Sequence, residues 1–171
     1  MFPNFTGQPF TRMKTHHLLS VAAILLIGCV SPRTAHVTAD NPEEKAQIER
    51  RLKEIFDAAE KKDLNRLDSY HLYGSKFTKF APESASRLDA TAARKGEHDG
   101  LGSINELSMH ADDLKIDLFG DVGIATFVFR YSFKAGGNSV EKKAHSSMVF
   151  VKDRGAWKIA HEHFSALKSD P

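Results

Sequence analysis

The stretch VGIATFVFRYSFK, from Val122 to Lys134, decides the expected fold of this chain. In an extended strand, successive side chains point to opposite faces. Ile124 and Val128 then share one face, and the other face carries a longer apolar series: Ala125, Phe127, Phe129, Tyr131 and Phe133. Apolar side chains on both faces are typical of a strand that lies centrally in a sheet and is covered on both sides. We therefore expect a strand over 122–134 at the centre of the domain.

Turn-forming residues flank this stretch and indicate an antiparallel meander. Gly120-Asp121 lies before it, Gly136-Gly137-Asn138 lies after it, and Asp153-Arg154-Gly155 follows further along. Glycine and asparagine are typical of the tight turns that join antiparallel strands. Four strands joined by these turns are predicted: Leu107–Asp117, Val122–Lys134, Val140–Lys152 and Trp157–Leu167.

Helical patterns precede the strands. Asn41-Pro42-Glu43-Glu44 combines a capping side chain, a proline and two acids, as expected at a helix N-terminus. Apolar residues follow on one helical face: Ile48, Leu52, Ile55, Phe56 and Ala59. Asp63 is predicted to cap a second, short helix, and residues 75–81 to form a first strand. Within 84–100 we expect a short helix that ends in a loop from Gly96 to Gly100. Helices followed by such a meander indicate an α+β fold.

The charge distribution argues against a nucleic-acid partner. The 171 residues carry a formal net charge of +2, from 24 basic and 22 acidic residues. Residues 1–28 contain Arg12 and Lys14 and no acid, so the chain from Cys29 onward has 24 − 2 = 22 basic and 22 acidic residues. A neutral domain lacks the basic surface that binds DNA or RNA. The single cysteine, Cys29, excludes a disulfide within the chain.

The N-terminal region has the pattern of an export signal. Lys14 precedes an apolar run from Leu18 to Gly28, which is too short for an ordinary transmembrane helix. It ends in Leu26-Ile27-Gly28-Cys29, which resembles the lipobox of bacterial lipoproteins. The resemblance implies cleavage before Cys29 and a lipid on its sulfur.

Three segments are therefore expected. Residues 1–28 form a signal peptide, 29–41 the lipidated cysteine and a flexible tether, and 42–168 the folded domain. Val30, where an inner-membrane protein would often carry Asp, favours the outer membrane, with the domain facing the periplasm. An ordinary signal peptide with an incidental cysteine is the alternative, and translation starts at either Met1 or Met13.

The closing segment, WKIAHEHFS from Trp157 to Ser165, follows a Lys-Asp-Arg-Gly turn and is similar to the last strand of SnoaL-like proteins. These belong to the nuclear-transport-factor-2-like (NTF2-like) superfamily, together with ketosteroid isomerase. Asp117 to Ala125 also resembles the family's central hairpin. The resemblance, over about 43–167, implies a cone in which N-terminal helices pack on a curved, mostly antiparallel sheet around a pocket, and it implies homodimers. The acidic base of the isomerases has no counterpart here, because Tyr70 to Phe77 contains no acid.

Histidines on the last two strands are the predicted site. Alternation places Trp157, Ile159, His161, His163 and Ser165 on one face, and His145 and Ser147 share a face of the neighbouring strand. If the two faces coincide, polar groups from both strands line the pocket. His163 and His145 are then the candidate catalytic acid or base. The candidate ligand-binding residues are Ser147, His161, Ser165, Trp157, Tyr70 and Phe77. Alternatively, the histidines are hydrogen-bonded members of a half-buried sheet, and the aromatic residues belong to the core.

The function expected from these observations is binding of a small, mostly apolar molecule by an exported, lipid-anchored domain, without a cofactor. One alternative is an isomerase, lyase or hydrolase that uses His163 as general acid or base. Another is a dimeric interaction module without catalysis. His161 and His163 with His145 also match a possible zinc site, because histidines two apart on a strand point the same way.

Overall fold

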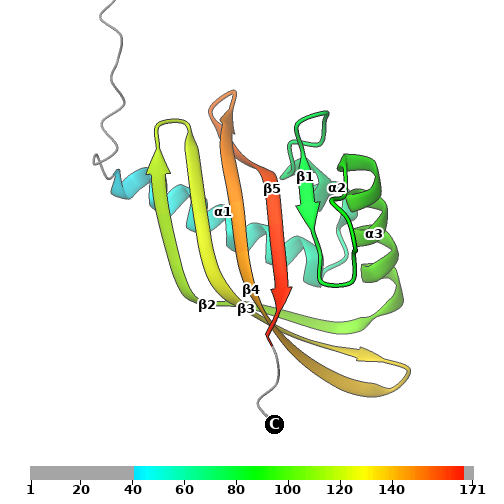
Figure 1. Ribbon diagram of the computed structural model, residues 1–171. Coiled ribbons are helices and arrows are strands. Elements are labelled where there is room, and N and C mark those ends of the chain that lie inside the picture. The colour runs from blue at the N-terminus through cyan, green and yellow to red at the C-terminus, as the bar shows by residue number, and fades with distance from the viewer. Residues whose placement is uncertain (1–40, 168–171) are drawn as a thin grey trace, which may run out of the picture. The chain divides into compact units, whose positions relative to one another are not determined.

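The structure, a computed structural model, describes residues 41–167. The predicted signal peptide, Cys29 and the tether up to Asp40 lie outside the described residues. The elements are α1 (Pro42–Glu60), α2 (Leu64–Ser69), β1 (Thr78–Phe80), α3 (Ala90–Ser103), β2 (Asn105–Phe119), β3 (Val122–Ala135), β4 (Asn138–Asp153) and β5 (Ala156–Ala166) (Figure 1). Within 41–167, no helix is both long and apolar enough to cross a bilayer.

The five strands form one sheet in the order β1-β5-β4-β3-β2. The β2–β3, β3–β4 and β4–β5 pairs are antiparallel, which confirms the predicted meander and the α+β class. β3 has a neighbour on each side, but β4 occupies the middle position. β1 pairs with β5 in parallel, an arrangement that the sequence patterns did not predict.

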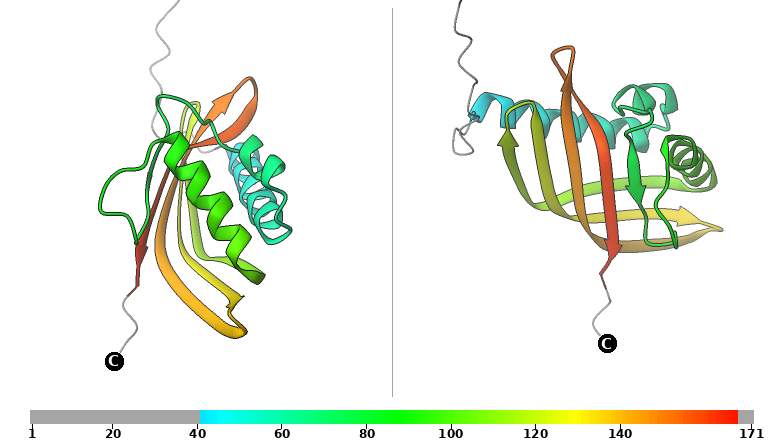
Figure 2. Two further views of the ribbon diagram at one scale, coloured as in Figure 1. Left: turned by 90° about the vertical axis from the view of Figure 1, so that its right-hand side faces the viewer. Right: turned by 45° about the horizontal axis from the view of Figure 1, so that its top comes forward.

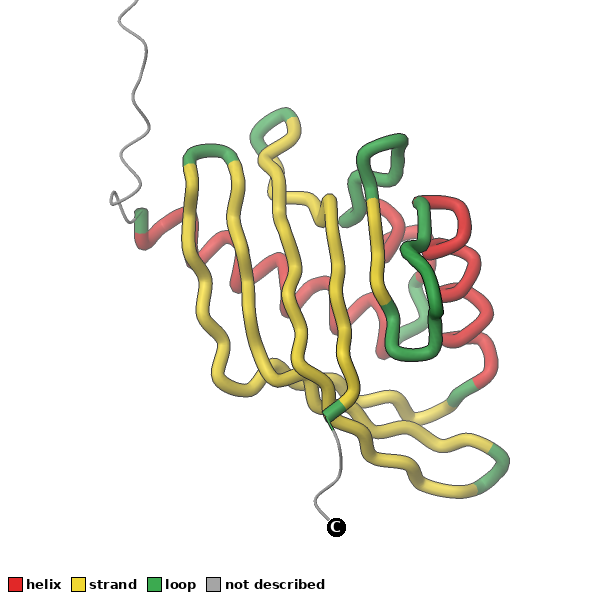
Figure 3. The backbone as a smooth tube through the Cα atoms, viewed as in Figure 1, coloured by secondary structure: helices red, strands yellow, loops and turns green. Residues whose placement is uncertain are grey.

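Both long helices lie on the same side of this sheet, and the sheet curves toward them (Figure 2). Figure 3 shows the ends of β2, β3 and β4 nearest α3 bending away from the straight part of the sheet. In β2 the pairing with β3 shifts register near Glu106 and Asp113, and both residues have positive φ. Such bulges increase twist and bend a strand. The bend leaves a space between the sheet, α1 and α3.

α1 closes one side of this space, as the sequence predicts. Asn41 Oδ1 accepts hydrogen bonds from the backbone N–H groups of Glu43 and Glu44, each at 3.2 Å. The predicted apolar face is buried, with Phe56 8% exposed. A Cβ atom at Gly123 would collide with the Ile48 side chain, so this glycine lets the helix lie close to β3.

α3 differs from the prediction. It begins at Ala90, where Asp89 Oδ1 accepts from Ala92 N at 2.9 Å, and it continues through the glycines at 96 and 100 that were expected to form a loop. Glycine is a poor helix former. Side-chain contacts hold the helix instead, because Arg94 pairs with Asp68 and Glu97 pairs with Lys79. Tertiary contacts thus outweigh local preference.

Candidate functional site

An inner cavity of about 400 Å³ lies between α1, α3 and the concave face of the sheet. Its walls are mostly apolar, and aromatic side chains from β3 and β5 form much of the surface. The principal apolar lining residues are Ile55, Phe56, Leu101, Leu107, Met109, Phe129, Tyr131, Phe133, Ala144, Met148 and Phe164. This volume lies within the range of roughly 300–1,000 Å³ that is common for small-molecule sites.

A bulge in β5 decides which polar residues face this cavity. Ile159 pairs with Phe150 of β4, but His161 pairs with the adjacent Val149, so Ala160 has no partner across the strands. The extra residue reverses the alternation. Before the bulge, odd-numbered residues such as Ile159 point inward. After it, the even-numbered Glu162 is buried and His163 is exposed.

The predicted grouping of Trp157 with His161, His163 and Ser165 is therefore wrong. A sequence signal for the bulge exists, because Ile159 and Phe164 are five residues apart. No strict alternation places both on the same face, so a core-facing assignment of both requires an irregularity between them.

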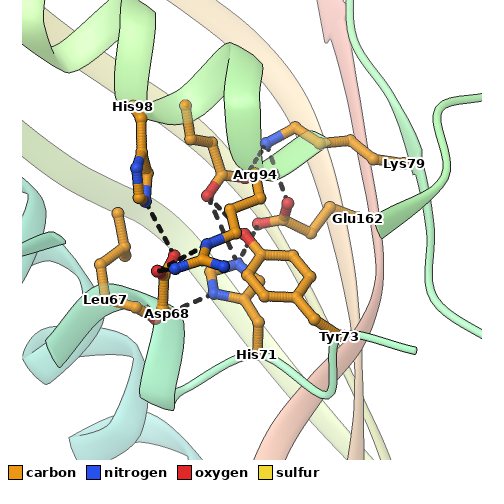
Figure 4. Close-up of polar contacts among 9 residues, drawn as sticks. Leu67, Asp68, His71, Tyr73, Lys79, Arg94, His98 and Glu162 are labelled. Atoms are coloured by element: carbon orange, nitrogen blue, oxygen red, sulfur yellow. Dashed lines mark hydrogen bonds and ion pairs between the residues drawn. The ribbon is translucent and has the colours of Figure 1, made fainter. Parts of the chain in front are cut away.

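Four charged or titratable side chains meet at the cavity wall, and we call them the buried tetrad: His71, Lys79, Glu97 and Glu162. They come from the segment after α2, from β1, from α3 and from β5. Lys79 Nζ lies 2.6 Å from Glu97 Oε1 and 2.9 Å from Glu162 Oε2. His71 Nε2 lies 3.6 Å from Glu162 Oε1 and 3.9 Å from Glu97 Oε2. Figure 4 shows His71, Lys79 and Glu162 converging on this point.

Backbone and ring contacts hold His71 firmly. Its Nδ1 donates to the Leu67 carbonyl oxygen at 3.0 Å, which places a proton on that nitrogen. The ring stacks on Tyr73 at a centroid distance of 4.7 Å, and the Phe77 ring meets it edge-on at 5.9 Å. Its side chain is 1% exposed, and Nε2 has no hydrogen-bond partner among the described residues. Buried polar atoms are nearly always hydrogen-bonded, so this exception singles out Nε2.

Burial and mutual charge shift the tetrad's pKa values in different directions. Burial alone would raise the Glu162 pKa, but Lys79 and His71 outweigh burial and lower it. Burial would lower the Lys79 pKa, yet the two carboxylates raise it. Burial and the Glu162 charge raise the Glu97 pKa. Burial would lower the His71 pKa, but Glu162 and Glu97 raise it.

The raised pKa values of His71 and Glu97 mean that the tetrad favours binding one additional proton. Two carboxylates and one ammonium leave one negative charge in excess, and a further proton on His71 or Glu97 neutralises it. Tyr73 is a separate, fixed donor to this group. Its hydroxyl donates to Glu97 Oε2 at 2.9 Å, and burial raises its pKa, so it stays protonated.

The tetrad also contains the one group of possible metal ligands found among residues 41–167. Ligand atoms of His71, Glu97 and Glu162 lie within 4.8 Å of one another. Such a set could coordinate a divalent cation. However, the Lys79 ammonium contacts both carboxylates and takes the place of that cation, so the residues fit an internal ion pair better than a metal. The predicted set of His145, His161 and His163 does not form such a group.

The predicted polar residues of β4 and β5 do share a face, but it is the outer one. Ser147 pairs with His163 and His145 pairs with Ser165, opposite the buried Ser146 and Glu162. The structure thus brings these residues together as predicted and places them away from the inner cavity. Their role in binding or catalysis stays a prediction.

Part of this face forms what we call the outer depression, of about 500 Å³. Its residues are Phe80, Ala81, Pro82, Ser84, His161, His163, Phe164, Ser165 and Ala166. The exposed Phe80 ring lies 5.8 Å from the His163 ring and 6.1 Å from the His161 ring. His161 Nδ1 forms a hydrogen bond with Thr78 Oγ1 at 2.7 Å.

The three aromatic residues predicted to contact a ligand lie in the core. Tyr70, Phe77 and Trp157 are 7%, 2% and 3% exposed, and none of them lines the inner cavity. Trp157 Nε1 donates to Glu44 Oε2 at 2.9 Å, which fastens α1 to β5. This placement matches the alternative interpretation of these residues as packing groups.

Comparison with known proteins identifies the fold and the family. The family model described as a SnoaL-like domain matches residues 48–169. A search of curated proteins finds no match. A solved structure of a proposed dehydratase of the NTF2-like family from Streptomyces avermitilis superposes with a TM-score of 0.68 at 15% identity, over 75% of this chain and 100% of that one.

Two further structures share the fold at similarly low identity. An NTF2-like protein of unknown function from Pseudomonas putida has a TM-score of 0.66 at 15% identity, over 77% of this chain and 92% of that one. A proposed calcium/calmodulin-dependent protein kinase II association domain from Xanthomonas campestris has a TM-score of 0.65 at 14% identity, over 80% and 95%. These similarities support the cone-like arrangement of helices on a curved sheet.

Proposed function

The chain belongs to the SnoaL-like domain family, and from that premise we propose that its inner cavity binds a small, mostly apolar molecule. The observation that supports this most is the combination of an aromatic wall with the buried tetrad. Binding sites for small molecules are typically apolar concavities with a few polar groups that orient the ligand. His71 Nε2, buried and without a partner among the described residues, is such a group.

Native mass spectrometry of the purified protein tests this proposal. A molecule that survives purification should be detected with the wild type and lost when the cavity is filled. Gly100 lines the cavity, and a Cβ there meets open space, so Gly100→Phe fills the cavity without backbone strain. Gly102, on the same helix, has equal room but lies outside the lining, so Gly102→Phe is the matched control. Equal retention of the molecule by both variants would contradict the proposal.

Acid–base catalysis is the second candidate function. The buried His71–Glu162 pair supports it, because shifted pKa values and a ligand-sized cavity coincide there. An isomerase, lyase or hydrolase acting in the cavity would use His71, whereas His163 could serve only a reaction in the outer depression. Dependence of any turnover on His71 or on His163 distinguishes these two sites.

We also propose that the domain is exported and anchored to a bacterial outer membrane by a lipid on Cys29. The support is the apolar run followed by Leu26-Ile27-Gly28-Cys29. Several acyl chains give stable attachment where one chain does not. Cys29→Ser should release the protein from membranes or leave an uncleaved precursor. Unchanged acylation and fractionation would contradict the proposal.

We further propose that the domain forms a homodimer through the outer face of its sheet. Ile124, Val128 and Val149 point to this face and are only half-buried within one chain. A second copy would remove these side chains from water. Sedimentation of the chain at micromolar concentration should give a dimer, and a persistent monomer would contradict it.

A further inference from the structure

We infer that the inner cavity selects ligands by the polar group that reaches the buried tetrad, preferring a hydroxyl and rejecting a carboxylate. This inference rests on the proposed binding function and deepens it, because it names the chemistry that the bound molecule must carry. The specificity-determining groups are His71 Nε2 and the two carboxylates of Glu97 and Glu162.

The first step is that the tetrad's one ammonium is already fully engaged. Lys79 Nζ lies 2.6 Å from one carboxylate and 2.9 Å from the other. An incoming carboxylate would find no cation at this wall other than a protonated His71 and would face two acids. Elsewhere in the lining, Lys142 and Glu83 are both exposed and opposite in charge, so they do not create a net positive field.

The second step is the unsatisfied imidazole nitrogen. Nε2 of His71 is too far from Glu162 Oε1, at 3.6 Å, for a hydrogen bond. When Nε2 is protonated, a ligand hydroxyl oxygen about 2.8 Å from both atoms would accept from Nε2 and donate to Oε1. His71 Nε2 and Glu162 Oε1 are therefore the two atoms that one polar ligand atom would bridge once it reaches the tetrad.

The third step uses the proton that the tetrad shares. When His71 is neutral, Nε2 accepts and the ligand must donate. When His71 is protonated, Nε2 donates and the ligand must accept, while the carboxylates still require a donor. A hydroxyl fits the protonated state with two hydrogen bonds, because it accepts from Nε2 and donates to the carboxylate, and it fits the neutral state with one, because its single hydrogen goes to one of two acceptors. An ammonium only donates, and a carboxylate only accepts.

The fourth step concerns the apolar part of the ligand. Phe129 and Tyr131 stack nearly parallel at 4.7 Å, and Tyr131 and Phe133 follow at 6.2 Å with an interplanar angle of 13°. These stacked rings form a continuous apolar strip along β3 in the same cavity as the tetrad. A planar ring that carries one hydroxyl is therefore a suitable probe of the inference.

Three naphthalene probes test it: naphthol, naphthoate and unsubstituted naphthalene, each titrated calorimetrically into the full chain at about pH 7, where naphthoate is ionised. Naphthol should bind at least about tenfold more tightly than either of the others, because hydrogen bonds to charged groups contribute strongly in a buried site. Gly100→Phe should weaken naphthol binding and Gly102→Phe should not, which locates the probe in the cavity.

Charge removal identifies the selecting residues. Glu162→Gln and Glu97→Gln should each reduce the preference of the site for naphthol over naphthoate by about tenfold, since each removes one repelling charge. Glu97, with 15% of its side chain exposed, is the variant expected to fold if Glu162→Gln does not. Glu49→Gln removes an exposed charge from α1 and should leave the preference unchanged.

The outcomes separate the two proposals. Equal binding of naphthol and naphthoate would overturn the inference and leave the binding function standing. An unchanged preference in both glutamine variants would overturn the role of the carboxylates. Failure of all three probes to bind would overturn the apolar binding function together with the inference.

Discussion

Glu162 and His163 are neighbours in the chain, but they belong to two different environments. Glu162 is 3% exposed, faces the inner cavity and contacts a lysine and a histidine from distant segments. His163 is exposed and lies beside Phe80 in the outer depression. One unpaired residue, Ala160, determines which of them is buried. Which side chains of β5 face the inner cavity thus depends on the register of the strand as much as on its residue types.

The contrast between the two faces of β5 leads to a first prediction. Aromatic side chains that pack at the inner cavity should contribute more to stability than those in the outer depression. Phe56 packs against Phe127 and Phe129 at centroid distances of 6.2 and 5.6 Å. Phe56→Ala should lower the free energy of unfolding by about 3–5 kcal/mol. Phe80, 42% exposed, is the matched control, and Phe80→Ala should cost less than about 1 kcal/mol. Urea denaturation measures both, and equal losses would remove the distinction between the two sides.

The same contrast applies to the charged residues. Glu162→Ala removes one partner of a buried ion pair, which typically costs about 3–5 kcal/mol. Because Lys79 keeps Glu97 as a partner, we expect the lower end of that range, about 3 kcal/mol. Glu106→Ala breaks a solvent-exposed pair with Lys134 and should cost no more than about 1 kcal/mol. A Glu162 variant as stable as the Glu106 variant would show that the tetrad does not support the fold.

Periodicity predicted most of the fold. The alternation over 122–134, the turns around it and the apolar face from Ile48 to Ala59 are local patterns, and the corresponding elements form as expected. The pairing of β1 with β5 is different, because Thr78 and His161 meet although they are 83 positions apart in the sequence. Neither a three-residue strand nor a parallel edge pairing leaves a clear periodic signal.

The candidate site was predicted less well for the same reason. His71, Lys79 and Glu97 lie in segments without strong periodicity, and α3 runs through glycines that locally disfavour a helix. Each becomes part of the tetrad only through long-range contacts. The bulge at Ala160 then exchanged the faces of β5, so the polar residues that were predicted inside lie outside.

A smaller effect is expected from pH, and it originates from the buried tetrad. The His71 pKa is raised, because Glu162 and Glu97 outweigh burial, so its contribution to stability is complete below its unfolded pKa of about 6.5 and is lost as pH rises through the folded value. Glu97, with a raised pKa, acts in the same direction. Glu162, with a lowered pKa, stabilises above about pH 4.5 and loses its contribution on acidification.

Thermal unfolding of the wild type should therefore show stability that decreases from about pH 6 upward, by at most about 1.4 kcal/mol per pH unit for one proton. His71→Gln should flatten this slope, and His163→Gln should keep it. A slope that disappears with His163→Gln instead would place the linked proton on the outer face.

The smallest expected effect is that of His163→Ala, and it decides between the two sites. Its side chain is exposed, and its nearest ring contact is the exposed Phe80 at 5.8 Å. The change should alter the free energy of unfolding by no more than about 0.5 kcal/mol, as is usual for surface positions. A ligand held in the inner cavity should stay bound in this variant and be weakened in His71→Gln. The measurement is a melt of each variant together with a titration of naphthol into both. If His163→Ala keeps its stability but loses the ligand, the binding site lies in the outer depression, and the histidines of β5 regain the role that their sequence pattern suggested.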